Sequence, residues 1–453
     1  MSTLTIAIII TFCIGYLFIA IESVTKINKA AISLLMFVAC WTLFMFSPET
    51  YIQGFSGQEL INEVSSVIER HLGNTSTTLF FLMGAMTIVE IVDQNGGFNW
   101  VRSALQTKSK RALMWRIALM TFVLSPVLDN LTTTIVMVMI LRKLIHDHKD
   151  RMIYASIVII AANSGGAFSP IGDVTTIMLW NKGVITAMGV ISELLIPSIV
   201  SMIVPAFIMQ YMLKGHIDDV RELTTPSDYK VHDFSGNQRK AVFAIGVGGL
   251  LFVPIFKGIT NLPPFIGILL VLSVLWVITE VFYRSQHHCK EREGTMKRVS
   301  NLLRNIDMST MMFFLGILMA VACLEETGVL TALGEGLNVA FNGNHYAVTG
   351  VIGVLSSIVD NVPLVAGCMG MYPVEVAGDM AVDGIFWQLL AYCAGVGGSI
   401  LIIGSAPGVV VMGLEKITFG WYLKHIAWIA FIGYILGILA YWVVRTYIFT
   451  VPL

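Results

Sequence analysis

The chain has 453 residues, of which 56% are hydrophobic and 13% are charged, and its formal net charge is −1. An ordinary soluble domain carries about 25% charged residues, so this composition excludes a soluble protein. Apolar runs long enough for a bilayer core of about 30 Å recur from end to end, which also excludes a soluble domain with one anchor. The composition therefore predicts an all-α polytopic membrane protein.

Twelve apolar segments follow one another along the chain, near residues 5–22, 29–46, 76–93, 113–144, 152–180, 191–213, 240–256, 263–283, 309–324, 345–372, 385–414 and 424–446. The first has no basic residue before it and no cleavage site after it, which favours a mature span over a signal peptide. Polar stretches at 214–239 and 284–308 interrupt the series. The scattered cysteines have no metal-ligand spacing, and we expect 287-HHC-289 to be an ordinary charged loop.

Lysine and arginine concentrate in cytoplasmic loops, and this rule predicts the orientation. With both termini outside, four of the 28 basic residues remain on the outer side, namely Arg70, Lys182, Lys257 and Arg445. That distribution requires segments 113–144 and 345–372 to enter and leave on the same side. Basic clusters flank the first and acidic loops flank the second. We therefore expect one hairpin from the cytoplasmic side and one from the outer side.

The hairpin turns should lie at 125-SPVLDN-130 and 356-SSIVDN-361. Pro126 is expected to break the first helix, and Pro363 follows closely behind the second turn. Irregular backbone at membrane depth is tolerated only where it is buried in protein or lines a watery cavity. Both turns are therefore candidate sites.

The two halves of the chain resemble each other at a spacing of 232 residues. Four glycine pairs share this spacing, namely Gly84 with Gly316, Gly96 with Gly328, Gly166 with Gly398, and Gly172 with Gly404. We predict a repeat at 1–213, a cytoplasmic linker at 214–239 and a second repeat at 240–453. Five crossings and one hairpin in each half would invert the second copy, as in transporters with inverted repeats and midplane sites.

Small residues break one span in each half, at 163-NSGGAFSPIGDVTT-176 and at 395-GVGGSILIIGSAPG-408. Glycine and proline at bilayer depth unwind a helix, which frees carbonyl groups for a cation and amides for an anion. Each broken transmembrane helix follows a predicted re-entrant hairpin. The sequence therefore predicts a site where the breaks meet the hairpin tips.

Oxygen-bearing residues dominate these tips and breaks, and hard oxygen ligands suit Na⁺ or Li⁺. The predicted cation and proton site comprises Ser125, Asp129, Asn130, Thr132, Asn163, Gly172, Asp173, Thr175, Thr176, Ser356, Asp360 and Asn361. Na⁺ itself is placed at Asp129, Asn130, Asp173 and Thr176, with accessory roles for Glu90, Ser399 and Ser405. Thr134 and Ser357 are instead expected to bond to the preceding turn.

The intramembrane aspartates carry the functional prediction. A charged aspartate at the centre of a span costs about 2.5 to 3.5 kcal/mol, so each one is a candidate functional group. No basic residue lies inside the apolar runs to pair with Asp129, Asp173 or Asp360. Such a carboxylate is neutralised either by a proton or by a metal cation. A group that accepts either but not both exchanges them, which predicts cation/proton antiport.

Other titratable residues are assigned to plainer roles. Most remaining acids, such as Glu193 and Glu280, are expected at solvated helix ends. His146 and His148 titrate in the physiological range, but a charged loop explains them. No nucleotide-binding fingerprint or soluble catalytic domain is present, so transport driven by ATP would need a separate subunit.

The paired Asp-Asn tips, the run Asn-Ser-Gly-Gly-x4-Ile-Gly-Asp-x-Thr-Thr and the duplication resemble the NhaD-type Na⁺/H⁺ antiporters of the ion transporter superfamily. The resemblance covers essentially the whole chain. It implies cation-coupled roles for Asp129, Asn130, Asn163, Asp173, Thr175, Thr176, Ser356, Asp360 and Asn361. Ser405 stands where Asp173 stands in the first half, so an equivalent second ion site is not expected.

Dicarboxylate carriers of that superfamily have Ser-Asn-Thr at each tip, whereas this chain has 129-DNLT-132 and 360-DNVP-363. The added negative charge argues against a dianionic substrate. Two alternatives stay open: an anion or metalloid carrier, such as a dicarboxylate symporter or an arsenite exporter, and an intramembrane hydrolase with paired aspartates.

The preferred prediction is a secondary transporter of the inner (plasma) membrane that exchanges Na⁺, and also Li⁺, for H⁺ in pH homeostasis. We expect no enzymatic activity, no cofactor and no nucleic acid partner, and we expect a homodimer in the lipid bilayer.

Overall fold

The computed structural model describes residues 2–20, 25–97, 104–105, 107, 109–213, 215, 234–285, 303, 307–358 and 360–449. Regular structure in these ranges is helical, apart from isolated bridge residues such as Glu375 and Ala381. Seven of the described helices are long and apolar enough to cross a membrane by length and composition. The predicted all-α membrane class is thus confirmed for the described residues. The triplet 287–289 lies outside them.

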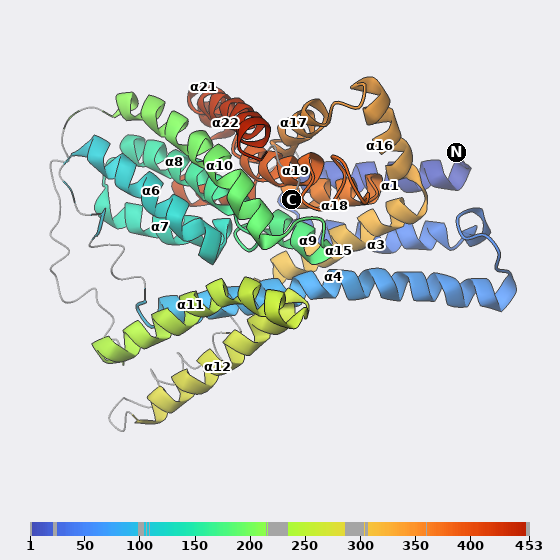
Figure 1. Ribbon diagram of the computed structural model, residues 1–453, viewed down its shortest axis with the longest axis horizontal. Helices are drawn as coiled ribbons and strands as arrows, with labels where there is room; N and C mark the ends of the chain where they lie inside the picture. Colours follow the sequence, from blue (N-terminus) through green and yellow to red (C-terminus); the bar gives the residue numbers. More distant parts are fainter. Residues whose placement is uncertain are drawn as a thin grey trace.

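The first half of the chain forms the following helices (Figure 1): α1 (Thr3–Ala20), α3 (Lys29–Phe44), α4 (Gly57–Gln94), α6 (Lys110–Leu128), α7 (Asn130–Leu144), α8 (His148–Ala167), α9 (Val174–Lys182) and α10 (Ala187–Met209). The second half forms α11 (Gly236–Thr260), α12 (Pro264–Ser285), α15 (Met308–Glu326), α16 (Val329–Ala340), α17 (His345–Ser356), α18 (Asn361–Met371), α19 (Ile385–Gly397), α20 (Ala406–Glu415), α21 (Phe419–His425) and α22 (Ala427–Tyr447). Short 3₁₀ turns occur at Pro48–Thr50 and Gln210–Met212.

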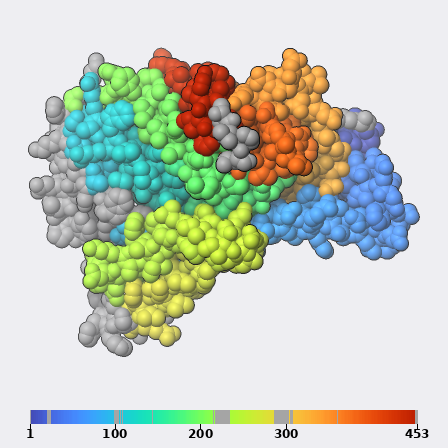
Figure 2. All heavy atoms as spheres, in the orientation of Figure 1, coloured from blue at the N-terminus to red at the C-terminus, as the bar shows by residue number. Residues whose placement is uncertain are grey.

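The helices pack in two groups. We use the name framework group for α1, α3, α4, α11, α12 and α15, and the name core group for α6 to α10, α17 to α20 and α22. Within the framework group, α3 of the first half packs along α15 of the second, and α12 of the second half packs along α4 of the first. Figure 2 shows α11 and α12, in yellow-green and yellow, projecting from the lower side of the molecule. The framework therefore mixes helices from both halves.

Glycines allow close approach at both of these exchanged contacts. A Cβ atom on Gly84 of α4 would lie 2.3 Å from the Ile268 side chain of α12. A Cβ atom on Gly316 of α15 would lie 2.6 Å from the Ser33 backbone of α3. Both distances are too short for a carbon contact. Gly84 and Gly316, which are 232 residues apart, thus have the same packing role at the α4–α12 contact and at the α15–α3 contact.

The core group surrounds the two hairpin tips. Helix α6 packs on α8 in the first half, α17 packs on α19 in the second, and α10 packs along α22. The short helix α9 contacts α18 and α19, while α20 contacts α7 and α8. Each short helix thus packs against helices from the other half of the chain.

Three features differ from the sequence prediction. Helix α4 has 38 residues rather than the predicted segment 76–93 and is roughly 57 Å long. Its first part was missed because Leu60, Val64 and Val67 bury one helical face of a polar stretch, which a search for apolar runs overlooks. Helix α16, a short amphipathic helix with Leu330 and Gly334 buried, was also absent from the predicted segments. Pro126 does not end the first hairpin helix, since α6 continues to Leu128.

Candidate cation site

Asp129 forms the tip between α6 and α7. Its backbone has φ 68° and ψ 160°, a conformation that residues other than glycine seldom adopt and that costs about 1 to 3 kcal/mol. Its carboxylate accepts hydrogen bonds from the Thr132 amide at 2.7 Å and the Thr132 hydroxyl at 2.8 Å. The next amide, that of Asn130, donates to the Gly172 carbonyl at 3.1 Å. The tip is thereby joined to the break between α8 and α9.

Asp173 caps the first short helix, α9. Its side chain is 1% exposed and accepts hydrogen bonds from the Thr175 amide at 2.9 Å and hydroxyl at 3.0 Å. Thr176 completes a capping box, because its hydroxyl accepts from the Asp173 amide at 3.3 Å. Capping groups and the positive end of the helix dipole favour a carboxylate at this position. The cap fixes the direction of the Asp173 side chain.

Side-chain amides from both halves converge on Asp173. Asn130 donates to one carboxylate oxygen at 2.7 Å and also approaches the Asn163 oxygen at 3.1 Å. Asn361, at the start of α18 in the second half, lies 3.4 and 3.5 Å from the two carboxylate oxygens. The Asn163 amide donates in turn to Ser405 at 2.8 Å, and to Ser399 at 2.9 Å. The second-half residues thus complete a cluster centred on a first-half acid.

Ser125 and Ser356 hold the hairpin tips against the neighbouring helices. The Ser125 hydroxyl donates to the Ala162 carbonyl at 2.5 Å, and the Ser356 hydroxyl donates to the Ala394 carbonyl at 2.9 Å. Both serines are fully buried. Their hydrogens are committed to backbone carbonyls, so their direct contribution is to position the tips.

Glycines at the breaks permit equally close approach. A Cβ atom on Gly172 would lie 2.8 Å from the Gly166 Cα and 2.9 Å from the Pro126 Cα. In the second half, a Cβ atom on Gly404 would lie 2.5 Å from the Ser357 carbonyl oxygen. In both halves the hairpin tip therefore presses directly on the unwound backbone of the break.

Asp360 does not join the cluster at Asp173 by a direct hydrogen bond. Its carboxylate lies 3.4 Å from the Lys29 ammonium at the start of α3, and it accepts a 3.4 Å bond from the Val362 amide. The prediction that no basic residue pairs with Asp360 is therefore wrong. Lys29 is the first residue of an apolar run, and its position in the sequence gives no sign that its ammonium reaches a tip in the other half of the chain.

Glu90 and Glu193, two acids outside the cluster, differ in their burial and in their partners. Glu90 is partly exposed, and its carboxylate accepts a 3.1 Å bond from Gln94 on the same helix. Glu193 is buried and binds the Arg445 guanidinium, and it accepts a 3.0 Å bond from the Tyr441 hydroxyl. The expectation that Glu193 is a solvated helix end is wrong. It clamps α10 to α22.

Hydroxyl groups on α7 and α17 have distinct roles. Thr134 donates to the Asn130 carbonyl and Ser357 donates to the Val354 carbonyl, each at 2.7 Å, which confirms the predicted bonds to the preceding turn. Thr133 is fully buried, and its hydroxyl has no hydrogen-bond partner among the described residues. A buried hydroxyl without a partner costs free energy. Thr133, one turn after Asn130, is thus an additional candidate ligand that the predicted set omitted.

A cavity of about 360 Å³ opens between α4, α9, α15 and α18. Its polar lining includes His71, Thr78, Asn181, Lys182 and Glu325. It does not contain the three aspartates, but α9 connects the two places. Nine residues of helix separate Asp173 from the Lys182 end, a distance of roughly 13 Å. This cavity is therefore a polar space near the site, not the site itself.

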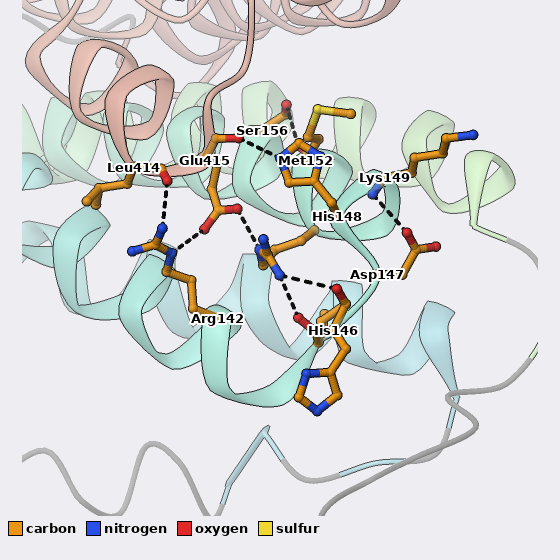
Figure 3. A network of polar contacts seen from close by, with 11 residues as sticks. Arg142, His146, Asp147, His148, Lys149, Met152, Ser156, Leu414 and Glu415 are labelled. Carbon is orange, nitrogen blue, oxygen red and sulfur yellow. Dashed lines mark hydrogen bonds and ion pairs between the residues drawn. The ribbon is translucent and has the colours of Figure 1, made fainter.

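A buried carboxylate also links the two halves beside the α7–α8 loop (Figure 3). Glu415, the last residue of α20, has a fully buried side chain that lies 2.5 Å from Arg151 and 3.1 Å from Arg142. The Arg142 guanidinium also donates to the Leu414 carbonyl at 2.9 Å, and a His148 ring nitrogen lies 2.7 Å from the Glu415 carbonyl. The pairing fixes the end of α20 against α7 and α8.

Glu415→Gln should lower the stability of the purified protein by about 3 kcal/mol, because the change leaves the half-buried Arg151 without its charged partner. Thermal unfolding in detergent measures the effect. Glu69→Gln is the matched control, since Glu69 is exposed on α4. Equal melting temperatures for the two variants would show that the Glu415 pairing does not hold these helices together.

The chemistry of the cluster follows from its charges. Asp129 and Asp173 have no ion pair with any residue that the structure describes. Hydroxyl and amide groups surround Asp173, and these groups serve a small hard cation or a proton equally well. These neutral neighbours do not compensate the negative charge of the carboxylates. The site is therefore suited to bind a cation or a proton.

Comparison with known proteins gives a consistent result. A family profile described as "Citrate transporter" matches residues 16–391. "Sodium/proton antiporter 1" of Arabidopsis thaliana is 42% identical over 448 residues, which cover 99% of this chain and 74% of that protein. "Sodium/proton antiporter 2" of the same plant is 40% identical over 436 residues, covering 96% of this chain and 99% of that protein.

A bacterial relative, "Na(+)/H(+) antiporter NhaD" of Vibrio cholerae serotype O1, is 27% identical over 474 aligned positions, which cover 99% of this chain and 94% of that protein. These relatives are transporters and not enzymes. The chain therefore belongs to the citrate transporter family and, within it, to the homologues of the NhaD-type sodium/proton antiporters.

Proposed function

We propose that this protein is a secondary transporter that exchanges Na⁺, and also Li⁺, for H⁺ across the membrane. The observation that carries the proposal is the buried Asp173 carboxylate, which neutral amides and hydroxyls surround and which has no cationic partner among the described residues. A buried charge of this kind needs a counter-charge. The names of the plant and bacterial relatives agree with sodium and protons as the exchanged ions.

The transported cation is assigned to Asp129, Asn130, Asp173 and Thr176. Side chains from Asn163, Thr175 and Asn361 complete the proposed pocket. Thr132 fixes the Asp129 carboxylate, and the Gly172 carbonyl fixes the tip through the Asn130 amide. Ser125 and Ser356 hold the two hairpins in register, and Ser399 and Ser405 orient Asn163. Each of these residues thus has either a ligand role or a positioning role in the proposal, whereas Asp360 and Glu90 have neither.

Exchange follows from competition for the same carboxylates. When Na⁺ binds, Asp129 and Asp173 are charged and share the cation. When Na⁺ leaves, protons neutralise them, so the site remains compatible with a dry environment in both loaded states. Two carboxylates with one Na⁺ would exchange two protons for one Na⁺. Such exchange moves net charge, and its rate should respond to membrane potential.

The proposed architecture is a pair of inverted repeats with two re-entrant hairpins. Three observations support it. One helix ends at Leu128 and the next begins at Asn130, and likewise one ends at Ser356 and the next begins at Asn361, as expected for hairpin tips. Breaks between α8 and α9 and between α19 and α20 follow the two turns. At the 232-residue spacing, α3 corresponds to α12 and α4 corresponds to α15. The contact of α3 with α15 therefore has its counterpart in the contact of α12 with α4.

Cysteine labelling tests the proposed orientation. In a background without the six native cysteines, Lys149→Cys should react with an impermeant reagent only from the cytoplasmic side, and Val376→Cys only from outside. Both positions are exposed, so accessibility of the side chain does not limit the reaction. Labelling of both positions from the same face would contradict the inverted hairpins.

Proton movement in proteoliposomes tests the function itself. With the purified protein under an imposed pH gradient, addition of Na⁺ or Li⁺ should dissipate the gradient across a series of pH values, while K⁺ should have little effect. Empty liposomes give the passive leak. Absence of cation-dependent proton movement at every pH would refute the antiporter proposal.

The family description favours one competing function, the transport of citrate or another organic anion. The charges at the site argue against it, because Asp129 and Asp173 would repel a polyanion and no described basic side chain forms an ion pair with either. Uptake of radioactive citrate into the same proteoliposomes separates the two functions. Citrate uptake without Na⁺-dependent proton movement would replace the proposal by the anion carrier.

A further inference from the structure

Lys29 and Asp360 form an ion pair between the two helix groups. Lys29 begins α3 in the framework group, and Asp360 caps α18 in the core group. Their charged atoms lie 3.4 Å apart, with side chains that are 24% and 18% exposed. The Lys29 ammonium also lies 4.3 Å from the centre of the Phe313 ring. An ammonium placed between a carboxylate and an aromatic face is well stabilised.

The two hairpin tips differ in how their acids are compensated. Asp129 in the first half has hydrogen bonds from Thr132 but no ion pair with a described residue. Asp360, its counterpart in sequence, has the Lys29 ammonium beside it. The difference continues at the breaks, where the first half has Asp173 and the second half has the neutral Ser405. At the tips and breaks, the first half therefore has two carboxylates without a cationic partner among the described residues, and the second half has none.

We propose that Lys29 is the resident counter-charge of the second hairpin tip and limits the chain to one exchangeable cation site. A lysine ammonium is a compact and strongly hydrated point charge, much like a small metal cation. Because it is covalently attached beside Asp360, it occupies the place that a transported cation takes next to Asp129. Asp360 is thus a structural partner of Lys29, whereas Asn361 extends from the same tip into the Asp173 cluster.

This inference rests on the proposed function, because it concerns the number of transported cations bound by each chain. It makes Lys29 a positioning residue that sets cation stoichiometry. A purely structural role for the ion pair would change stability without changing the number of ions bound. The two roles are therefore separable by counting bound Na⁺.

The test is equilibrium binding of radioactive Na⁺ to the purified full-length chain at alkaline pH, where protons compete least. The wild type should bind one Na⁺ per chain at saturation. Lys29→Gln keeps a polar side chain, one atom shorter, but removes its charge, so Asp360 should recruit a second Na⁺ and saturation binding should double. Lys29→Arg keeps the charge and should retain one Na⁺ per chain.

The double variant Lys29→Gln with Asp360→Asn removes both charges and should return to one Na⁺ per chain. Asp360→Asn alone should also bind one Na⁺, which keeps the test decisive if Lys29→Gln does not fold. One Na⁺ per chain in a folded Lys29→Gln variant, or loss of Na⁺ binding in Asp360→Asn, would overturn the inference while leaving antiport intact. A wild type that binds no Na⁺ would instead refute the proposed function and this inference with it.

Discussion

Asp173→Asn is expected to reduce Na⁺/H⁺ exchange to the level of empty liposomes. The asparagine keeps the size of the side chain and can still accept a hydrogen bond from the Thr175 amide, so the cap of α9 is retained. It removes the buried carboxylate for which Na⁺ and the proton would compete. Cation-dependent proton movement in proteoliposomes, at equal protein content, measures the loss.

Ser405→Ala is the matched control for Asp173, because Ser405 holds the corresponding cap position on α20. The Asn163 amide would lose one acceptor at 2.8 Å but keep Ser399 at 2.9 Å. A change of a few fold in the apparent Michaelis constant for Na⁺ is therefore expected, with exchange preserved. Comparable loss of exchange in both variants would indicate two equivalent ion sites and would contradict the single first-half site.

Asp129→Asn is expected to leave a folded protein without Na⁺/H⁺ exchange. Asparagine has the same size and shape as aspartate, so it meets the same backbone strain at this position, and it can accept the Thr132 amide bond, so the tip should keep its shape. The variant has no group that takes up a proton at the tip. Size-exclusion profiles and melting temperatures check the fold, and proteoliposome assays check the exchange.

The wild type should show competition between protons and Na⁺ at Asp129. Lowering the pH adds protons to the carboxylate, so the apparent Michaelis constant for Na⁺ should rise by up to about tenfold per pH unit where one proton binds, following the mass-action form of linkage. The maximal rate should change little, because saturating Na⁺ displaces the protons. Normal pH-dependent exchange by Asp129→Asn would mean that this carboxylate is structural.

Local chemistry made much of the candidate site predictable. Asp-Asn at a turn, followed downstream by a span rich in glycine, indicated where the helix would be interrupted. The structure places Asn130, Asn163 and Asp173 in hydrogen-bond contact at that point. The proposed role of these residues in ion binding, the expected Li⁺ transport and the homodimer all stay predictions.

Contacts between distant parts of the chain were not predictable in the same way. Lys29 and Asp360 are 331 residues apart, and neither position carries a local signal of the other. Glu415 ends an apolar run beside Lys416, so a sequence search reads it as an exposed helix end, yet α7 and α8 bury it completely. Ion pairs of this kind arise from tertiary packing, which neither composition nor periodicity encodes.

The exchange of helices between the halves of the framework group also determines the order in which the molecule is completed. The Trp41 ring nitrogen of α3 donates to the Met319 carbonyl of α15 at 2.8 Å, across a separation of 278 residues. At a synthesis rate of about 5 to 20 residues per second, α3 waits roughly 14 to 56 s for this partner. During that interval its contact face must be shielded by lipid or by the insertion machinery. A chain that stopped after the first half would lack both α15 and α12, so neither α3 nor α4 would have its main packing partner.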